Sequence, residues 1–337
     1  MYVSEEKMNR QELLTIIQSL MPGVNINETS SDKIYFSKNS ISTNTNEVQI
    51  IKVNYETGLE CCIYANKIIP ILQKIKADDI SIAIDDNQLI IQSKKTTFSL
   101  PLVEAVPLEF ISEFNLDNFI SLSPQFFSDL KLALISVDNT EQNFPFNYIN
   151  VQNKKILTTD NHRGSVIKTK YKGDSFLLPY HIIKDLLKYS MTHIQVTDNT
   201  IHFYDEKKQL HFICKNTFSG SFPDVEKLFE KNNEMTEITF PDALIDSINT
   251  VSIMANEINN VISIKIKDKK IICSASNSYG KAKEIIDSDI EINTSFKINA
   301  AFFAEILSHI KTGLLSINTL MFTTENFNHI IALIIEE

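Results

Sequence analysis

Three similar segments decide how this chain folds, and they read ANKIIPILQKIK at 65–76, PYHIIKDLLKYS at 179–190 and NAAFFAEILSHIKT at 299–312. Their apolar residues recur at helical spacing, so each segment predicts a helix that buries one side. Pro179 and Asn299 suit a helix start. Pro70 lies about one turn into the first segment, which is early enough to be tolerated.

A second amphipathic segment precedes each of these helices. These earlier segments begin near Met8, Ser123 and Phe240, about 115 residues apart, which is close to the usual size of a domain. Strand-like pairs follow the earlier helices at 33–36 with 40–43, 148–151 with 156–159, and 261–266 with 271–275. Further pairs follow the later helices at 80–84 with 88–92, at 194–197 with 201–204, and from 314 to the end of the chain.

The order helix, strands, helix, strands therefore recurs three times and predicts an α+β fold of three repeated domains, each with two helices packed on antiparallel sheets. We expect the domains at 1–113, 114–233 and 234–337. The alternative is an ordinary α+β protein whose helices recur by chance, and three copies in matching order argue against it. Three such domains with their helices on one side would form a half-ring with helices lining the inside. Two-fold symmetry could close it, with edge strands paired across the boundary.

Composition excludes several classes of protein. The chain has only 7 glycines and contains neither a G-x-G-x-x-G nor a P-loop motif, so no nucleotide cofactor is expected. Cys61, Cys62, Cys214 and Cys273 lack the spacing of a zinc site, so no metal is expected and the thiols are predicted to be reduced and packed. No apolar run reaches the roughly 18 residues of a membrane span, and the acidic N-terminal segment does not resemble a signal peptide. The predicted location is the cytoplasm.

Charge is distributed unevenly along the chain. The net charge is -10, which argues against a protein that coats nucleic acid with its whole surface. The six predicted helical segments together carry +3, so the rest of the chain carries -13. If the helices line a DNA channel, their basic side chains are the candidate phosphate contacts: Arg10, Lys67, Lys74, Lys76, Lys131, Lys184, Lys188 and Lys311. Any single exposed lysine could equally be an ordinary surface charge, and the segment 240–254 is acidic.

Four short motifs give the chain a family resemblance. They are Thr159-Asp160-Asn161-His162-Arg163, Phe222-Pro223-Asp224, Phe98-Ser99-Leu100-Pro101 followed by Val106-Pro107, and Asn277 with Gly280-Lys281-Ala282 and Glu284. In this order and spacing they resemble the bacterial β sliding clamp, the processivity subunit of DNA polymerase III. The resemblance implies a ring-shaped homodimer that encircles duplex DNA without reading its sequence and tethers the replicative polymerase, with no catalysis of its own.

The resemblance also implies a pocket that receives a short peptide from the polymerase and the clamp loader. Carried over by motif or alignment, its lining comprises Tyr148, Thr159, Asn161, His162, Arg163, Pro223, Lys227, Leu228, Ile330, Ala332, Leu333 and Ile334. Asn161 replaces the family's usual glycine, Gly164 replaces an apolar residue, and Ala332-Leu333-Ile334 replaces a Met-Pro-Met run. These changes and a shortened first domain indicate a divergent member, and a phage or other mobile element would fit as its source.

Two other functions stay open on the sequence alone. The first is a clamp-like protein that binds a polymerase or loader without closing around DNA. The second is an enzyme built on Asp160, His162 and Arg163, but no nucleophile or metal-ligand set stands near them in the sequence. A turn at the rim of the pocket explains these three residues better.

Overall fold

The computed structural model describes residues 6–25, 27, 31–105, 116–140, 143–216, 222–230, 235–256 and 258–334. Val106 and Pro107, quoted above for the resemblance, lie outside these residues. By contact, the chain forms two compact units, Met1–Pro124 with Ile182–Thr217 and Gln125–His181 with Phe218–Glu337. The boundaries of the three predicted domains stay a prediction.

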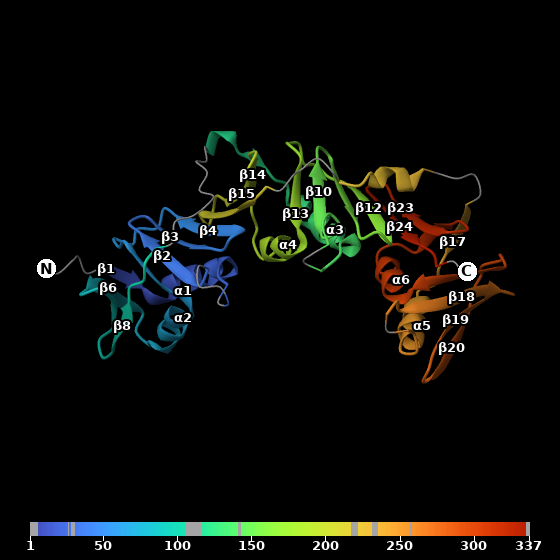
Figure 1. Ribbon diagram of the computed structural model, residues 1–337, viewed down its shortest axis with the longest axis horizontal. Coiled ribbons are helices and arrows are strands. Elements are labelled where there is room, and N and C mark those ends of the chain that lie inside the picture. Colours follow the sequence, from blue (N-terminus) through green and yellow to red (C-terminus); the bar gives the residue numbers. More distant parts are fainter. Residues whose placement is uncertain are drawn as a thin grey trace. The chain divides into compact units, whose positions relative to one another are not determined.

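Apart from short 3-10 helices, the described residues form the same order of elements three times (Figure 1). The first copy comprises β1 (Glu6–Asn9), α1 (Arg10–Leu20), β2 (Lys33–Ser37), β3 (Ser40–Asn44), β4 (Val48–Val53), β5 (Cys61–Tyr64), α2 (Ala65–Lys74), β6 (Asp79–Asp85), β7 (Gln88–Gln92) and β8 (Thr97–Pro101). The second comprises β9 (Ile120–Ser121), α3 (Pro124–Ala133), β10 (Tyr148–Gln152), β11 (Lys155–Thr159), β12 (Arg163–Lys168), β13 (Phe176–Pro179), α4 (Tyr180–Leu186), β14 (His193–Val196), β15 (Thr200–Asp205) and β16 (Leu210–Lys215). The third comprises β17 (Thr236–Thr239), α5 (Ala243–Ser252), β18 (Val261–Lys267), β19 (Lys270–Asn277), β20 (Gly280–Asp287), β21 (Thr294–Asn299), α6 (Ala300–Leu307), β22 (Thr312–Leu315), β23 (Thr319–Thr323) and β24 (Phe327–Ala332).

This order confirms the predicted alternation of helices and strands, with two kinds of correction. The later helices are shorter than predicted and end at Lys74, Leu186 and Leu307. In α2 the chain turns extended at Ile75 (φ -66°, ψ 128°), which directs it into β6. The short strand before each first helix was not predicted, because two to four residues such as those of β9 carry too little periodicity to read.

The first unit contains an eight-stranded antiparallel sheet in the order β5-β2-β3-β4-β16-β15-β14-β9 and a four-stranded sheet in the order β1-β6-β7-β8. In the large sheet β4 pairs with β16, from Val48 opposite Cys214 to Lys52 opposite Leu210. This pairing joins the first copy of the repeat to the second.

The second unit repeats the same plan. Its eight-stranded sheet has the order β13-β10-β11-β12-β24-β23-β22-β17, and its four-stranded sheet has the order β20-β19-β18-β21. Here β12 pairs with β24, from Arg163 opposite Ile331 to Ile167 opposite Phe327. This second pairing joins the second copy to the third.

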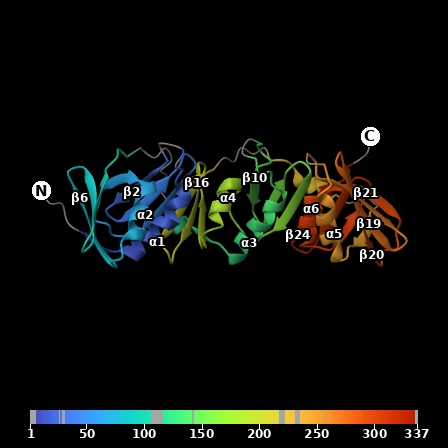
Figure 2. The ribbon, with the colours of Figure 1, turned by 90° about the horizontal axis from the view of Figure 1, so that it is seen from below.

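Apolar helix faces form the cores. In the first unit α1 packs against α2, with Leu13, Ile17 and Leu72 fully buried. In the second, α5 packs against α6 (Figure 2), and the rings of Phe240 and Phe303 meet edge to face with centroids 5.2 Å apart. None of the helices in the described part of the chain has the length and apolarity of a membrane span.

Candidate peptide pocket and basic surfaces

The turn between β11 and β12 holds the motif residues in one hydrogen-bonded loop. Asp160 Oδ1 accepts hydrogen bonds from the backbone N–H of His162 (3.0 Å) and of Arg163 (2.8 Å). Thr159 Oγ1 accepts from Asn161 N (3.2 Å) and donates to Arg163 O (2.8 Å). Asn161 has φ 73°, a left-handed conformation that asparagine tolerates better than most residues other than glycine, so this replacement preserves the turn.

Arg163 connects this turn to α6. Its Nε donates to Asp160 Oδ2 (2.7 Å), a nearly buried ion pair in which the side chains are 10% and 8% exposed. Its second nitrogen donates to Glu305 Oε2 (2.7 Å), and the guanidinium lies 3.8 Å from the centre of the Phe302 ring. A planar cation held by two carboxylates and an aromatic face has little freedom to move. Arg163 therefore has a structural role in connecting the turn to α6, and its guanidinium is not free to move toward a bound peptide.

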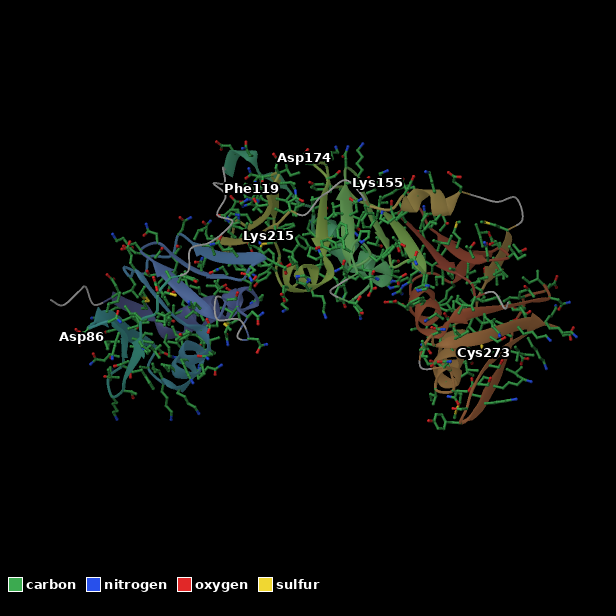
Figure 3. All side chains as sticks on the ribbon, viewed as in Figure 1. Asp86, Phe119, Lys155, Asp174, Lys215 and Cys273 are labelled. Atoms are coloured by element: carbon green, nitrogen blue, oxygen red, sulfur yellow. The ribbon has the colours of Figure 1, made fainter. Side chains whose placement is uncertain are left out.

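An apolar cluster lies on the other face of β12. Leu157, Val166 and Val225 are buried together, with partly buried Phe222 and Phe229 packed against them. The 3-10 helix Val225–Phe229 is anchored by an ion pair between Glu226 and Lys155, which is labelled in Figure 3. The surroundings of the predicted pocket are thus aliphatic and aromatic here, which suits an apolar peptide anchor.

Gly164 explains how the predicted pocket residues come together. A Cβ at this position would lie 3.2 Å from Leu228 Cδ1, 3.2 Å from Val225 Cγ1 and 3.6 Å from Ile330 Cγ2. Leu228 and Ile330 therefore close over the position where the family has a larger apolar residue. Leu228 remains 48% exposed and is the apolar side chain available to a ligand at this point.

The remaining predicted pocket residues do not all meet at this point. Ala332 N donates to His162 O (2.8 Å), which places the end of β24 beside the turn. Leu333 is buried, whereas Ile334 N donates to the backbone of Lys297 on β21 (2.9 Å). Tyr148 packs edge to face on Phe144. Lys227 pairs with Asp224 (3.1 Å), next to Pro223, in an exposed ion pair.

Leu157, Val166, Val225, Phe302 and Glu305 adjoin the predicted pocket residues but were not predicted with them. The alternation of apolar residues along β11 and β12 could have indicated the first two. The pairing of Arg163 with Glu305 joins residues 142 positions apart, and no local pattern signals it.

A buried polar cluster lies beside the predicted pocket residues, on the face of the sheet that carries Arg163. His329 Nδ1 is within hydrogen-bond distance of Ser165 Oγ (2.9 Å) and Ser136 Oγ (3.2 Å). Burial, with the nearby Arg163 charge, lowers the pKa of His329 to about 3, so the imidazole is neutral at neutral pH. The cluster is sealed from solvent and links β12 with β24 and with Ser136.

The candidate DNA-contacting residues have different surroundings. Lys67, Lys74 and Lys76 are exposed on or just after α2, and Lys131 and Lys184 are exposed on α3 and α4. Lys188 pairs with Asp185 (2.5 Å) and Lys311 with Asp242 (3.1 Å). The Arg10 side chain donates to the backbone oxygens of Ala77 (3.0 Å) and Leu72 (3.1 Å), so it ties α1 to the end of α2.

Two lysines that the sequence reasoning missed lie beside the predicted ones. Lys94 and Lys95, in the turn between β7 and β8, line the same hollow of about 370 Å³ as Lys74 and Lys76. The two lysine pairs come from segments about 20 residues apart. Only the fold of the first unit brings them together.

The cysteines are thiols that take no part in a disulfide or a metal site in the described part of the chain. All four cysteines are unpaired, as predicted. Burial raises the pKa of Cys62 to about 11 and that of Cys273 to about 12, which disfavours reactive thiolates. Among the described residues no group of three or more His, Cys, Asp or Glu side chains could hold a metal ion.

Comparison with known proteins finds similarity to beta sliding clamps in sequence and in fold. Residues 226–329 match the family "DNA polymerase III beta subunit, C-terminal domain". The beta sliding clamp of Helicobacter pylori (strain J99) is 21% identical over 267 residues, covering 74% of this chain and 71% of that protein. The beta sliding clamp of Staphylococcus aureus (strain Mu50) is 23% identical over 262 residues, covering 72% of this chain and 68% of that protein.

Two solved structures have the same fold at low identity. The DNA polymerase III subunit beta of Pseudomonas aeruginosa aligns with a TM-score of 0.85 and 15% identity over 98% of this chain and 100% of that one. The C. crescentus beta sliding clamp aligns with a TM-score of 0.86 and 15% identity over 99% of this chain and 100% of that one. The fold is therefore the α+β fold of a sliding clamp. Its sequence is similar to that of beta sliding clamps at low identity, as its motifs predicted.

Proposed function

We propose that this chain is a DNA sliding clamp, a non-catalytic cytoplasmic homodimer whose ring encircles duplex DNA and tethers a replicative polymerase for processive synthesis. In this proposal its domains are 1–113, 114–233 and 234–337. Each half-ring contributes three of them, with helices lining the inside.

The repeated pairing of strands is the observation that carries this proposal. The third strand after each first helix is β4, β12 or β20, and the last strand of each copy is β8, β16 or β24. Within the chain β4 pairs with β16 and β12 with β24, while β20 and β8 lie at the ends of their four-stranded sheets. Within the chain, therefore, β8 and β20 each lack the corresponding partner strand. A second copy can complete both pairings at once by placing its β8 on β20 and its β20 on β8.

The proposed channel contacts are the lysines that remain exposed on or beside the helices. They are Lys67, Lys74, Lys76, Lys131 and Lys184, together with Lys94 and Lys95 from the neighbouring turn. Lys188 and Lys311 can exchange their exposed carboxylate partners for phosphate. Arg10 is proposed to hold α1 against α2, so that its contribution to DNA binding is indirect.

Retention on DNA circles tests the proposal directly. The clamp is assembled on a nicked circular plasmid with a clamp loader, and bound protein is measured by gel filtration before and after the circle is cut. We expect bound clamp to be retained on the circle at high salt and lost on linearisation, since a closed ring slides off free ends. Retention that does not depend on the form of the DNA would contradict a ring. It would favour a clamp-like protein that does not close.

The peptide pocket is proposed at the turn 159–163, the Val225–Phe229 helix and the end of β24. His162, Asn161, Leu228 and Ala332 lie at or near its surface, and the Arg163 ion pairs set its shape. The polymerase and the clamp loader would each insert a short peptide with an apolar anchor.

Substitution of Leu228 by Asp, together with His162 by Ala, tests the pocket. We expect at least a ten-fold loss of affinity for the polymerase's clamp-binding peptide by calorimetry, with an unchanged dimer mass. The exposed pair Lys170→Ser and Lys172→Ser, in the connection between β12 and β13, is the matched control and should bind normally. Unchanged affinity in the L228D/H162A variant would place the peptide elsewhere.

A further inference from the structure

One face of the β20-β19-β18-β21 sheet carries an unusual number of lysines. Side chains alternate along a strand, so the strand register fixes which residues share that face. The lysine face comprises Lys265, Lys267, Lys270, Lys281, Lys283 and Lys297. Its acidic member is Asp287. The opposite face, with Ile264, Cys273 (labelled in Figure 3) and Ile298, is buried.

The fold itself does not require this charge. The four-stranded sheet of the first unit, β1-β6-β7-β8, has on its outward face one lysine, Lys7, and two aspartates, Asp79 and Asp85. The chain as a whole carries a net charge of -10. In addition, Lys267 stands directly opposite Lys270, and like charges at opposed positions destabilise a sheet. Asp268, 4.0 Å from Lys267, and Asp287, opposite Lys270, offset part of this repulsion. The number of lysines on this face therefore calls for an explanation other than the fold.

Three of the six lysines line a hollow of about 500 Å³ whose lining is both polar and apolar, with Val261 and Ala282 among its residues. Its lining includes Ser263, Ser274 and Ser276, with Lys281, Lys283 and Lys297 around them. In one cross-strand row the order is Lys283, Ser274, Ser263 and Lys297, so two hydroxyls lie between two ammonium groups. Hydroxyl and ammonium groups are the donors that phosphate oxygens accept from.

The spacing along the strands fits a chain of phosphates. Lys281 and Lys283 are two positions apart on one strand and so about 7 Å apart. This distance is on the order of that between successive phosphates in an extended nucleic-acid strand. Within the described residues no carboxylate forms an ion pair with Lys281, Lys283, Lys265 or Lys270.

An exposed aromatic ring adjoins the lysine face. Tyr279 is 88% exposed in the turn between β19 and β20, two positions before Lys281. Asn277 Oδ1 accepts hydrogen bonds from the N–H groups of Tyr279 (2.9 Å) and Gly280 (3.1 Å), which fixes the turn. Because the backbone of the turn is fixed and the ring is exposed, Tyr279 is suited to stack on an unpaired base.

We propose that the lysine face binds single-stranded nucleic acid, with lysine and serine side chains on successive phosphates and Tyr279 stacked on a base. An acidic polypeptide would also satisfy the lysines but would gain nothing from Tyr279. A duplex would satisfy them as well, but its bases are already stacked. The inference does not rest on ring closure, since the sheet belongs to a single unit of one chain.

The test is fluorescence anisotropy of the full-length chain with a labelled linear oligothymidylate at low salt, where topological retention plays no part. For the variant K281S/K283S we expect about a ten-fold loss of affinity. The slope of log affinity against log salt should fall by about 1.4, since each lost phosphate contact on a single strand contributes about 0.7. Tyr279→Ser should lose about ten-fold and Tyr279→Phe little, because stacking needs the ring and not the hydroxyl.

The control variant K170S/K172S removes the same charge from the same unit and should bind like the unchanged protein. Thermal melting of every variant verifies folding. The proposal is overturned if the unchanged protein does not bind the oligonucleotide, or if the control loses as much affinity as K281S/K283S. It is also overturned, in favour of an acidic polypeptide, if Tyr279→Ser binds fully and polyglutamate of equal charge displaces the oligonucleotide.

Discussion

Asp160 and Arg163 hold together the turn at which the peptide pocket is proposed. One carboxylate fixes two backbone N–H groups of the turn and the guanidinium that crosses to α6. Both side chains are nearly buried, so water cannot readily replace a hydrogen bond that is lost, and the loss is costly. The positions of His162 and Ala332 depend on this arrangement, because His162 O accepts from Ala332 N.

Replacement of Asp160 by Asn should therefore lower the free energy of unfolding by about 1–3 kcal/mol, because a charge-assisted bond to Arg163 is lost. It should weaken peptide binding as well. Urea denaturation and calorimetry measure the two effects. Asp224→Asn, which breaks the exposed pair with Lys227, is the matched control and should cost less than about 1 kcal/mol. Equal effects of the two variants would show that Asp160 does not organise the turn.

Three buried histidines make stability depend on pH. Burial lowers the pKa of His202 to about 4, and burial lowers the pKa of His211 and of His329 to about 3. In the unfolded chain a histidine has a pKa of about 6.5. Between these values the unfolded state binds more protons, so stability is complete above about pH 6.5 and falls as the pH drops toward 4.

We expect the urea midpoint to fall steadily from pH 7 to pH 4.5. The slope of unfolding free energy against pH gives the number of protons taken up on unfolding. In His329→Gln this number should be smaller by about one, even if the variant is less stable throughout. Urea titrations at several pH values measure that slope. A slope unchanged by the substitution would mean that His329 does not contribute to the acid sensitivity.

At the scale of the element, α2 carries an internal conflict. Pro70 is its sixth residue, has no N–H to donate to the preceding turn, and is exposed to solvent. Its neighbours Ile68 and Leu72 are fully buried, and their packing holds the helix in place. Tertiary contacts here outweigh the local cost of proline.

Pro70→Ala should raise the free energy of unfolding by about 2 kcal/mol. The gain is the roughly 3 kcal/mol cost of an interior proline, less the up to about 1 kcal/mol by which proline restricts the unfolded chain. Thermal melting followed by circular dichroism measures the change. A lower melting temperature would show that Pro70 is needed for the geometry of α2, for example by opening its last turn near Lys74.

At the scale of the whole molecule, the proposed assembly depends on edge strands at opposite ends of the chain. Ile285 of the edge strand β20 is a large apolar residue that is 55% exposed. In the proposed dimer it would pack beside β8 of the second copy. Ile253, 76% exposed at the end of α5, lies off the edge and serves as a comparison.

Sedimentation equilibrium should give a mass near twice the 38.4 kDa of one chain. Ile285→Asp should shift the protein toward the single-chain mass at micromolar concentration, because a charge at the seam loses water without a partner. Ile253→Asp should leave the dimer intact. A dimer unaffected by Ile285→Asp would place the seam elsewhere, and a monomeric unchanged protein would contradict the ring.

The sequence by itself determined the repeated helices and strands, the turn at 159–163 and the absence of nucleotide-binding glycine motifs. These features depend on residues a few positions apart: helical spacing in 299–312, or a left-handed asparagine at 161 beside an aspartate that accepts its neighbours' N–H groups. Local patterns of this kind are legible because the interacting groups are covalently close.

Only the tertiary structure decided which strands meet. The pairing of β12 with β24 brings Arg163 opposite Ile331, and that juxtaposition brings together the residues of the proposed pocket. The alternation that puts six lysines on one face of a sheet also became visible only through the register of four strands. Pairings over such separations are set by the burial of whole sheet faces against helices, an energy shared among many residues. No short stretch of sequence is therefore sufficient to predict these pairings.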